Sequence, residues 1–351
     1  MRFASVVGAR PQFIKAAAVS SVLRQQHKEL LIHTGQHYDY ALSAQFFEEL
    51  SIPEPDYSLA CGSGTHGAQT GRMLETIEQV LLKERVDQMI TYGDTNSTLA
   101  AAMVAAKLHI PIAHVEAGLR SFNRAMPEEI NRVITDHLSE YLFCPTEYAR
   151  HNLRREGIVR GVEVVGDVMY DMLLQVMPKL DEHEKPLLDR LHITAHNYVL
   201  MTVHRAGNTD DPVAMQAIAQ AVNSLEMPVI FPVHPRTRVC LQHYGIDWQK
   251  HVQLIEPLGY LDMLALERAA HRILTDSGGI QKEAFLLGVP CVTMREETEW
   301  METVEAGWNT LTGTHRRQIV ESLALPAPQA TDWKPYGRGD AAQRIVSSWQ
   351  E

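Results

Sequence analysis

The sequence has few cysteines, and they stand far apart. They are Cys61, Cys144, Cys240 and Cys291 in a chain of 351 residues, and no two have the close spacing of a redox or metal-binding pair. A disulfide framework is therefore not expected, which fits a reducing compartment. The chain also lacks H-E-x-x-H and any close group of His, Cys and Asp, so the sequence predicts no metal site.

Long apolar runs are missing as well. No stretch approaches the ~20 apolar residues that span a bilayer, and the first run, Phe3–Val7, is too short for a signal peptide and is soon followed by Arg10 and Lys15. We therefore expect a soluble, cytoplasmic protein without a membrane partner. Positive charge is not in excess either: the net charge is -11, whereas nucleic-acid binders usually carry a basic face. Nucleic acid is not an expected partner.

What is present is an ordinary globular composition, with 45% hydrophobic and 21% charged residues. The length suggests two domains of roughly 150–200 residues each. In the first half, short apolar runs alternate with helix-like segments, which favours a parallel sheet covered by helices. The expected strands are Phe3–Val7, Leu30–His33, Gln88–Tyr92, Ile112–Val115 and Tyr141–Cys144, and the expected helices are Pro11–Gln26, Tyr40–Leu50, Thr70–Lys83, Thr95–Lys107 and Glu128–Leu138.

The alternation restarts after Val162–Gly166 and predicts a second α/β unit. Asp181–Leu191 is polar and charged, and we interpret it as an exposed or linker-like stretch. A short helix is expected over 340–349. Parallel sheets bind ligands at the carboxyl ends of their strands, so residues that follow the strands are the candidates for a site. The expected strands of this half are Tyr198–Val203, Val229–Val233, Gln253–Ile255 and Arg272–Thr275.

Two cations follow the first strand. Arg10 and Lys15 flank a helix start, where both can reach one anion together with backbone N–H groups. The alternative is that they are two surface cations. The glycine spacing after this strand is not that of the dinucleotide fingerprint, so NAD binding is not expected.

Three carboxylates follow the later strands of the first half. They are Asp94, Glu116 and Glu128. A carboxylate at the end of an apolar strand is costly to bury without a partner, so each has a structural reading beside a catalytic one. The structural readings are a helix cap by Asp94 or Thr95, a pair of Glu116 with His114 or Arg120, and a pair of Glu128 with Arg132.

The second half places histidines and glycines at strand ends. His204 and His234 each follow an expected strand and precede or closely precede an arginine. Ser277, Gly278 and Gly279 lie at a helix start, where backbone N–H groups can donate to phosphate oxygens, or where the chain simply turns tightly. Glu283, within the next two turns, can accept hydrogen bonds from ribose hydroxyls. This pairing of donors and acceptor predicts a site for a nucleoside diphosphate.

Taken together, seven segments resemble one family, the non-hydrolysing UDP-N-acetylglucosamine 2-epimerases. The resemblance implies an α/β fold of two Rossmann-like domains facing a cleft, like the B-type glycosyltransferases, and a homodimer. It implies domains at 1–167, joined by a C-terminal helix of about 337–351, and at 168–336. The segments are GARPQFIKA (8–16), TGQHYD (34–39), GDTNST (93–98), HVEAGLRS (114–121), PEEINR (127–132), DSGGIQKEA (276–284) and REETEW (295–300).

The resemblance also implies the chemistry. Members eliminate UDP across C1–C2 of the sugar to give a 2-acetamidoglucal and then add UDP back with C2 protonated on the other face, without a metal or redox cofactor. The residues that it places at catalysis are Asp94, Glu116, Glu128 and His204. Those that it places at substrate binding are Arg10, Lys15, Arg132, His234, Ser277, Gly278, Gly279 and Glu283.

Three departures leave alternatives open. Gly207 stands where the family often has Glu, and the Tyr-Asp-Tyr after His37 differs from members activated by their own substrate. Several segments also resemble a sister branch that acts on UDP-2,3-diacetamido-2,3-dideoxyglucuronate, for whose carboxylate Arg120 or Arg124 would be a candidate cation. A hydrolysing epimerase, a glycosyltransferase and a non-catalytic UDP-sugar sensor are the further alternatives.

Overall fold

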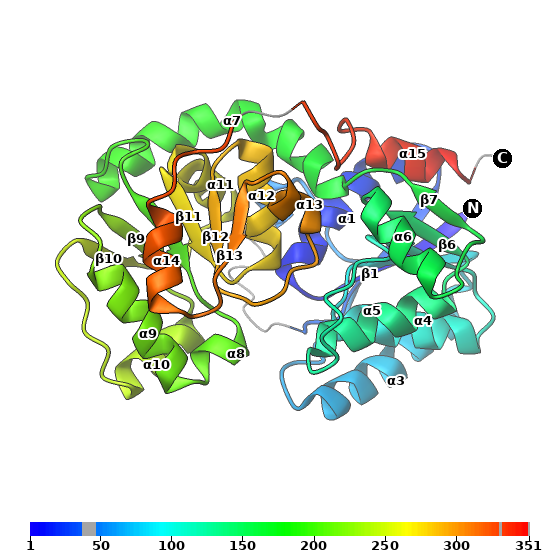
Figure 1. Cartoon of the computed structure of the whole chain (residues 1–351). Coiled ribbons are helices and arrows are strands. Elements are labelled where there is room, and N and C mark those ends of the chain that lie inside the picture. The colour runs from blue at the N-terminus through cyan, green and yellow to red at the C-terminus, as the bar shows by residue number, and fades with distance from the viewer. Residues whose placement is uncertain (37–46, 330–331, 350–351) are drawn as a thin grey trace. The chain divides into compact units, whose positions relative to one another are not determined.

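The computed structural model describes residues 1–36, 47–329 and 332–349, and Figure 1 shows its ribbon. Contacts divide the chain into two compact units. Unit 1 comprises Met1–Gln175 with Lys334–Glu351, and unit 2 comprises Val176–Trp333. Each unit has its own sheet and its own core, and each is described by itself.

Unit 1 is built on a seven-stranded sheet in the order β3-β2-β1-β4-β5-β6-β7. All its paired strands run parallel. The order reverses direction between β1 and β4, so the loops after these neighbouring strands open at the switch point where such sheets bind ligands. The strands are β1 (Arg2–Val7), β2 (Lys28–His33), β3 (Tyr57–Ser58), β4 (Gln88–Tyr92), β5 (Ile112–Val115), β6 (Tyr141–Cys144) and β7 (Val162–Val164).

The helices of unit 1 pack on this sheet mainly through small or aliphatic side chains. In α4 the run Ala100–Ala102 is fully buried, and it packs in the same core cluster as Met73 and Ile77 of α3. Short side chains let the helices approach the strands closely. The helices are α1 (Arg10–Leu23), α3 (His66–Glu84), α4 (Asn96–Lys107), α5 (Pro127–Leu138), α6 (Glu147–Arg155), the first part of α7 (Val168–Leu191), and α15 (Ala341–Ser347).

The end of the chain returns to unit 1, where α15 packs against α1 (Figure 1). The Ala342 N–H donates to the Asp171 carboxylate at 2.7 Å, so a side chain of α7 holds the start of α15. Trp349 lies against the rings of Phe3 and Phe143, at centroid distances of 4.7 and 5.7 Å. These contacts hold the end of the chain against α7, β1 and β6.

Unit 2 repeats the arrangement with a six-stranded parallel sheet in the order β10-β9-β8-β11-β12-β13. Its switch point lies between β8 and β11. The strands are β8 (Val199–Thr202), β9 (Val229–Pro232), β10 (Val252–Ile255), β11 (Arg272–Thr275), β12 (Cys291–Thr293) and β13 (Asn309–Leu311). The helices are α8 (Ala206–Thr209), α9 (Pro212–Asn223), α10 (Pro235–His243), α11 (Tyr260–Ala269), α12 (Gly278–Leu287), α13 (Met301–Glu305) and α14 (Arg316–Leu323).

Side chains of β8 alternate between two cores. Val199 and Met201 pack with α9 and α14, whereas Leu200 packs with α7 and α11 on the other face. Alternation with a period of two is what a pleated strand covered on both faces requires. The predicted α/β fold with two parallel sheets is therefore confirmed.

Two sequence expectations need comment. Asp181–Leu191, expected to be linker-like, is the second half of α7, so that interpretation is wrong. Its leucines at 187, 188 and 191 are buried in the unit 2 core, and His183 pairs with Asp262 of α11; the charged residues form only the outer face of an amphipathic helix. The expected helix Tyr40–Leu50 lies largely outside the described residues, as does the segment after His37.

Within the described ranges, no helix combines the length and apolarity needed to cross a bilayer. The same part of the chain contains no group of three or more His, Cys, Asp or Glu side chains that could hold a metal ion.

Candidate active site

The loop after β1 is fixed by one side chain. Gln12 accepts hydrogen bonds from the N–H groups of Gly8 (2.8 Å) and Ala9 (3.2 Å). Its amide nitrogen donates to the Tyr92 carbonyl at 2.9 Å, so the ends of β1 and β4 are joined. Arg10 is exposed at the start of α1, where a cation and the first backbone N–H groups can meet an anion.

Lys15 reaches from α1 to the end of β5. Its Nζ lies 2.6 Å from Glu116 Oε1, and both side chains are less than a tenth exposed. The partner of Glu116 is therefore Lys15, and the alternatives His114 and Arg120 are bound elsewhere. Glu116 also has a φ of 74°, a strained backbone conformation for a residue with a side chain, of the kind that gathers at functional sites.

Asp94 follows β4 and contacts α5. Its Oδ2 accepts from Arg132 Nη2 at 2.7 Å and from Nε at 3.0 Å. The cap of α4 is Thr95, whose hydroxyl accepts from the Thr98 N–H, so Asp94 is not needed for capping. The side chain of Asp94 is 26% exposed, which leaves it accessible to a ligand.

The two glutamates at the start of α5 differ in environment. Glu129 is buried and accepts from the N–H groups of Ser121 (2.9 Å) and Phe122 (3.0 Å) and from Arg132 (2.8 Å). It shapes the loop before α5. Glu128 is half-buried, and the considered pair between Glu128 and Arg132 is not observed among the described residues. Of the two, Glu128 is the one suited to contact a substrate.

Arg120 is not available to a substrate. It is 3% exposed, and it donates to Asp136 at 2.7 Å and to both oxygens of Glu156 at 2.7 and 2.8 Å. The suggestion that it could bind a sugar carboxylate is therefore wrong. Arg124, the other candidate, is exposed.

In unit 2 the loops after β8 and β11 are joined by Asp276. Its fully buried carboxylate accepts from the N–H groups of His204 (3.1 Å) and Arg205 (3.0 Å) and from the side chain of Asn208 (3.1 Å). The His204 ring is left 46% exposed, with Nδ1 3.4 Å from Asp276. Asp276 was not among the predicted site residues, although it opens the DSGG segment.

The start of α12 is partly exposed. Ser277 caps the helix by accepting from the Ile280 N–H. A Cβ placed on Gly278 would lie 3.6–3.9 Å from Glu299, Trp300 and Arg205, so these side chains surround the first turn. Backbone N–H groups at such a helix start are donors for phosphate.

Three further predicted residues of unit 2 lie near strand and helix ends. Gly279 is in the first turn of α12, and Glu283, in the second turn, is 6% exposed. His234 is exposed after β9 and caps α10, with its Nδ1 accepting from the Arg236 N–H at 3.2 Å.

The REETEW segment, which carried part of the resemblance, flanks α12. Arg295 forms a double hydrogen bond with Glu299, at 3.0 and 2.9 Å. Lys282 Nζ lies 4.2 Å from the centre of the Trp300 ring, and this lysine is fully buried. These contacts hold Trp300 and Glu299 beside Gly278.

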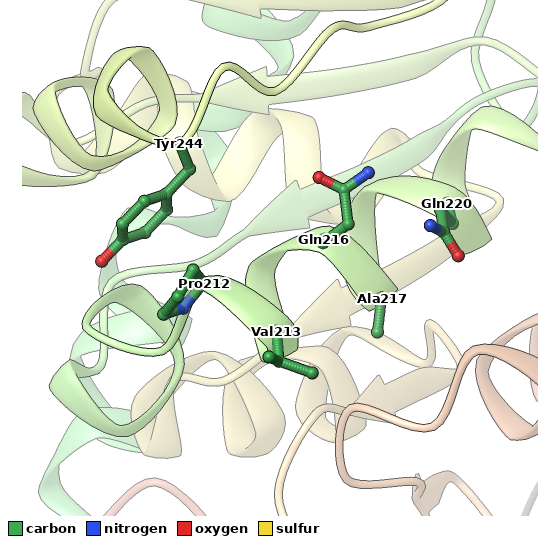
Figure 2. A pocket seen from close by; sticks show the side chains of 6 residues that line it. All are labelled: Pro212, Val213, Gln216, Ala217, Gln220 and Tyr244. Atoms are coloured by element: carbon green, nitrogen blue, oxygen red, sulfur yellow. The ribbon is translucent and has the colours of Figure 1, made fainter.

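A hollow of ≈ 460 Å³ lies elsewhere in unit 2, along α9, as Figure 2 shows. Val213, which is 76% exposed, and Tyr244 lie on its rim. None of the predicted site residues lines it, so it is not the candidate active site.

The chain matches the family model described as UDP-N-acetylglucosamine 2-epimerase over residues 21–350. The protein belongs to this family. The resemblance stated from the seven segments is thereby confirmed.

Individual relatives match along nearly the whole chain. The protein is 51% identical, over 99% of its length and 98% of the other, to a UDP-N-acetylglucosamine 2-epimerase homolog of Methanococcus maripaludis. It is 48% identical, with the same coverage, to the UDP-2,3-diacetamido-2,3-dideoxy-D-glucuronate 2-epimerase of Pseudomonas aeruginosa. The crystal structure of Methanocaldococcus jannaschii UDP-GlcNAc 2-epimerase with UDP-GlcNAc and UDP matches with a TM-score of 0.94 and 43% identity, covering 100% and 99% of the two chains.

The likeness of fold extends beyond the family. Phytolacca americana UGT2, a glycosyltransferase, matches with a TM-score of 0.57 at 13% identity, covering 99% and 92% of the chains. At this identity the match concerns the fold alone, and it confirms the expected resemblance to the B-type glycosyltransferases.

Proposed function

We propose that this protein inverts C2 of a UDP-linked 2-acetamido sugar and converts UDP-N-acetylglucosamine to UDP-N-acetylmannosamine. The observation that carries the proposal is the match over the whole chain to the M. jannaschii enzyme with UDP-GlcNAc and UDP. The carboxylates after β4 and β5 and at the start of α5 supply the groups that such a reaction needs.

The C2 proton is not acidic, because C2 is not next to a carbonyl, so the proposed reaction does not form a carbanion at C2 but couples loss of this proton to departure of UDP. A base takes the C2 proton as the C1–O bond to UDP breaks, which leaves a 2-acetamidoglucal and UDP. UDP oxygen then re-forms the bond to C1 while an acid delivers a proton to C2 on the opposite face. Both steps need an acid or base within hydrogen-bond reach and a site that excludes water.

We assign the proton transfers to Asp94, Glu116 and Glu128, with His204 as a further group at the sugar. Lys15 holds one oxygen of Glu116, and Arg132 holds one oxygen of Asp94. Fixed cations of this kind keep a carboxylate oriented for transfer at a chosen atom.

We assign UDP to the residues around the start of α12. Its first N–H groups, at Gly278 and Gly279, would donate to the diphosphate with the Ser277 hydroxyl, and Glu283 would accept from the ribose. Arg10 and His234 would complete the diphosphate site. The dipole of a ten-residue helix favours anions at this end.

UDP-2,3-diacetamido-2,3-dideoxyglucuronate is the second candidate substrate. It is favoured by the 48% identity to the P. aeruginosa enzyme that acts on it. Its sugar carries a carboxylate, and Gly207 lacks the negative charge that the family often places there. With Arg120 committed to Asp136 and Glu156, Arg124 is the remaining cation of the two first considered.

The test is NMR of the purified protein with each UDP-sugar in heavy water. Epimerisation of UDP-N-acetylglucosamine with deuterium entering C2 supports the first substrate, and the same change only in the diacetamido-uronate supports the second. Free sugar with accumulating UDP would identify a hydrolysing enzyme. Tight binding of both without any change would overturn the proposal in favour of a sensor.

We also propose that the protein is a cytoplasmic homodimer. Ile130 and Ile134, one turn apart on α5, are 46% and 36% exposed, and Phe122 in the preceding loop is 65% exposed. Such apolar side chains on one helix suit a contact with a second copy. Light scattering should give twice the chain mass for the wild type and less for Ile134→Glu; a monomeric wild type would contradict the dimer.

A further inference from the structure

His114 lies on β5 with no exposed surface, two residues before Glu116. Its Nδ1 is 2.7 Å from Asp136 Oδ1, and its Nε2 is 2.7 Å from the Gly93 carbonyl oxygen. Both ring nitrogens therefore face oxygen atoms. A neutral imidazole has only one N–H, so in that form one of these two short contacts would bring two lone pairs together.

The carboxylate of Asp136 is itself committed as an acceptor. Its Oδ2 accepts from Arg120 Nη1 at 2.7 Å and from the Gly118 N–H at 3.2 Å. Burial raises the pKa of Asp136, but its contacts with His114 and Arg120 outweigh this and leave the pKa below its usual value. Asp136 is thus an ionised acceptor, and the Gly93 carbonyl carries no proton, so both protons in the two contacts belong to His114.

The other charged groups around this pair balance it. Arg120 is shared between Asp136 and Glu156, so two cations face two carboxylates. Cys144 on β6 stays a neutral thiol, because burial raises its pKa. Burying a charge that is paired and hydrogen-bonded at every polar atom costs much less free energy than burying an unpaired one.

We infer that His114 is a buried imidazolium that positions the two loops carrying Asp94 and Glu116. Its Nε2–H holds the carbonyl of Gly93, directly before Asp94. Its partner Asp136 holds the N–H of Gly118, two residues after Glu116. His114 is a positioning residue, since no contact places it on substrate. Its effect on catalysis rests on the proposed function, whereas its protonation does not.

Asp136 extends the same link to the third acid. It lies on α5, the helix that begins with Glu128 and carries Arg132. One ion pair therefore ties the ends of β4 and β5 to α5. Losing it would let all three acids move relative to one another, and a misplacement of about 1 Å can cost ~10²-fold in rate.

The first experiment is ¹⁵N NMR of histidine-labelled wild-type protein. The expected result is one histidine with protons on both ring nitrogens, as the oxygen atoms of Asp136 and Gly93 beside them require. The signal is assigned by its absence in His114→Gln or, if that variant does not fold, by its shift in Asp136→Asn. A single-proton ring for His114 would overturn the inference whatever the enzyme's substrate.

The second experiment measures turnover, KM and UDP affinity of His114→Gln and Asp136→Asn. The matched control is Glu29→Gln, which removes a buried carboxylate at the amino end of the same sheet, where it accepts from Ser5, Ser20 and Arg24. We expect kcat to fall by ~10–10²-fold with UDP affinity nearly unchanged, and the control to lose thermal stability only. Equal kcat in all three variants would refute the positioning role. If the wild type turned over neither sugar, the proposed function would fail while the NMR result would stand.

Discussion

Replacing Gly93 with Ala should push the ammonium group of Lys15 away from the carboxylate of Glu116. Gly93 has a φ of 61°, in the left-handed region, and a Cβ there would lie 2.8 Å from Lys15 Nζ and 3.7 Å from Glu116 Oε1. An ordinary contact begins at 3.4 Å, so Nζ must withdraw by about 0.6 Å. The Lys15–Glu116 distance, now 2.6 Å, would lengthen.

The change therefore has two costs. The left-handed backbone costs an alanine about 1–2 kcal/mol, which lowers Tm by roughly 2–4 °C per kcal/mol in a domain of this size. Displacing Nζ by part of an ångström in a site where about 1 Å can cost ~10²-fold should lower kcat by roughly tenfold or more.

Gly245→Ala is the matched control. Gly245 has a φ of 60°, and a Cβ there meets nothing within 4 Å, so this variant carries the backbone cost alone. The assay is the initial rate of epimerisation at saturating substrate, with thermal unfolding of both variants. If Gly93→Ala kept the kcat of Gly245→Ala, the ammonium of Lys15 would have no part in placing Glu116 and the reasoning would be wrong.

Four other substitutions give distinct outcomes. Glu128→Gln should lower kcat by ~10²-fold with Tm unchanged. Glu129→Gln should instead lower Tm, because its buried carboxylate accepts from Ser121, Phe122 and Arg132. A loss of kcat only in Glu129→Gln and a loss of Tm only in Glu128→Gln would contradict the assignment. Asp276→Ala removes the carboxylate that accepts from His204, Arg205 and Asn208. Because the loss of one buried hydrogen bond can cost ~1–3 kcal/mol, UDP affinity measured by calorimetry should weaken by at least tenfold. Burial raises the pKa of Asp171; the folded state therefore holds this proton more tightly, and stability falls as pH rises from about 4 through the raised pKa. Asp171→Asn should flatten that part of the Tm–pH curve, and an unchanged slope would exclude Asp171 as its source.

The sequence predicts the elements of the sheets well because each strand carries its own signal. Gln88–Tyr92 and Ile112–Val115 are short, mostly apolar runs and are the observed β4 and β5. Buried parallel strands need apolar side chains on both faces, so such runs are visible without any partner. The residues that follow them, Asp94 and Glu116, could be selected for the same reason.

The partners of those residues could not be predicted. Lys15 and Glu116 are 101 residues apart in sequence, and they meet only because α1 follows β1 while β5 lies one strand beyond β4. His114 and Arg120 were nearer in sequence and equally able to pair. Strand order, which no local pattern contains, decides between them.

The linker-like interpretation of one charged segment was wrong because composition does not show which face of a helix is buried. Asp181–Leu191 contains Pro186 and many charges, both of which argue against a buried helix. Yet Leu187, Leu188 and Leu191 follow helical spacing and are buried. The helical spacing of three leucines was a better guide than the composition of the stretch.

Each unit contains a buried carboxylate that suits a positioning role rather than proton transfer. Asp136 in unit 1 and Asp276 in unit 2 are buried, and each accepts from three donors: His114, Gly118 and Arg120 for Asp136, and His204, Arg205 and Asn208 for Asp276. A carboxylate whose oxygens are already occupied by several donors has little room to contact a substrate. It therefore suits orientation, whereas Asp94, Glu116 and Glu128 are the acids that we assign to proton transfer. The consequence is testable in the dependence of rate on pH: amide replacement of Asp136 or Asp276 should lower the whole profile without changing its shape, whereas replacement of a reacting acid should remove one of its limbs.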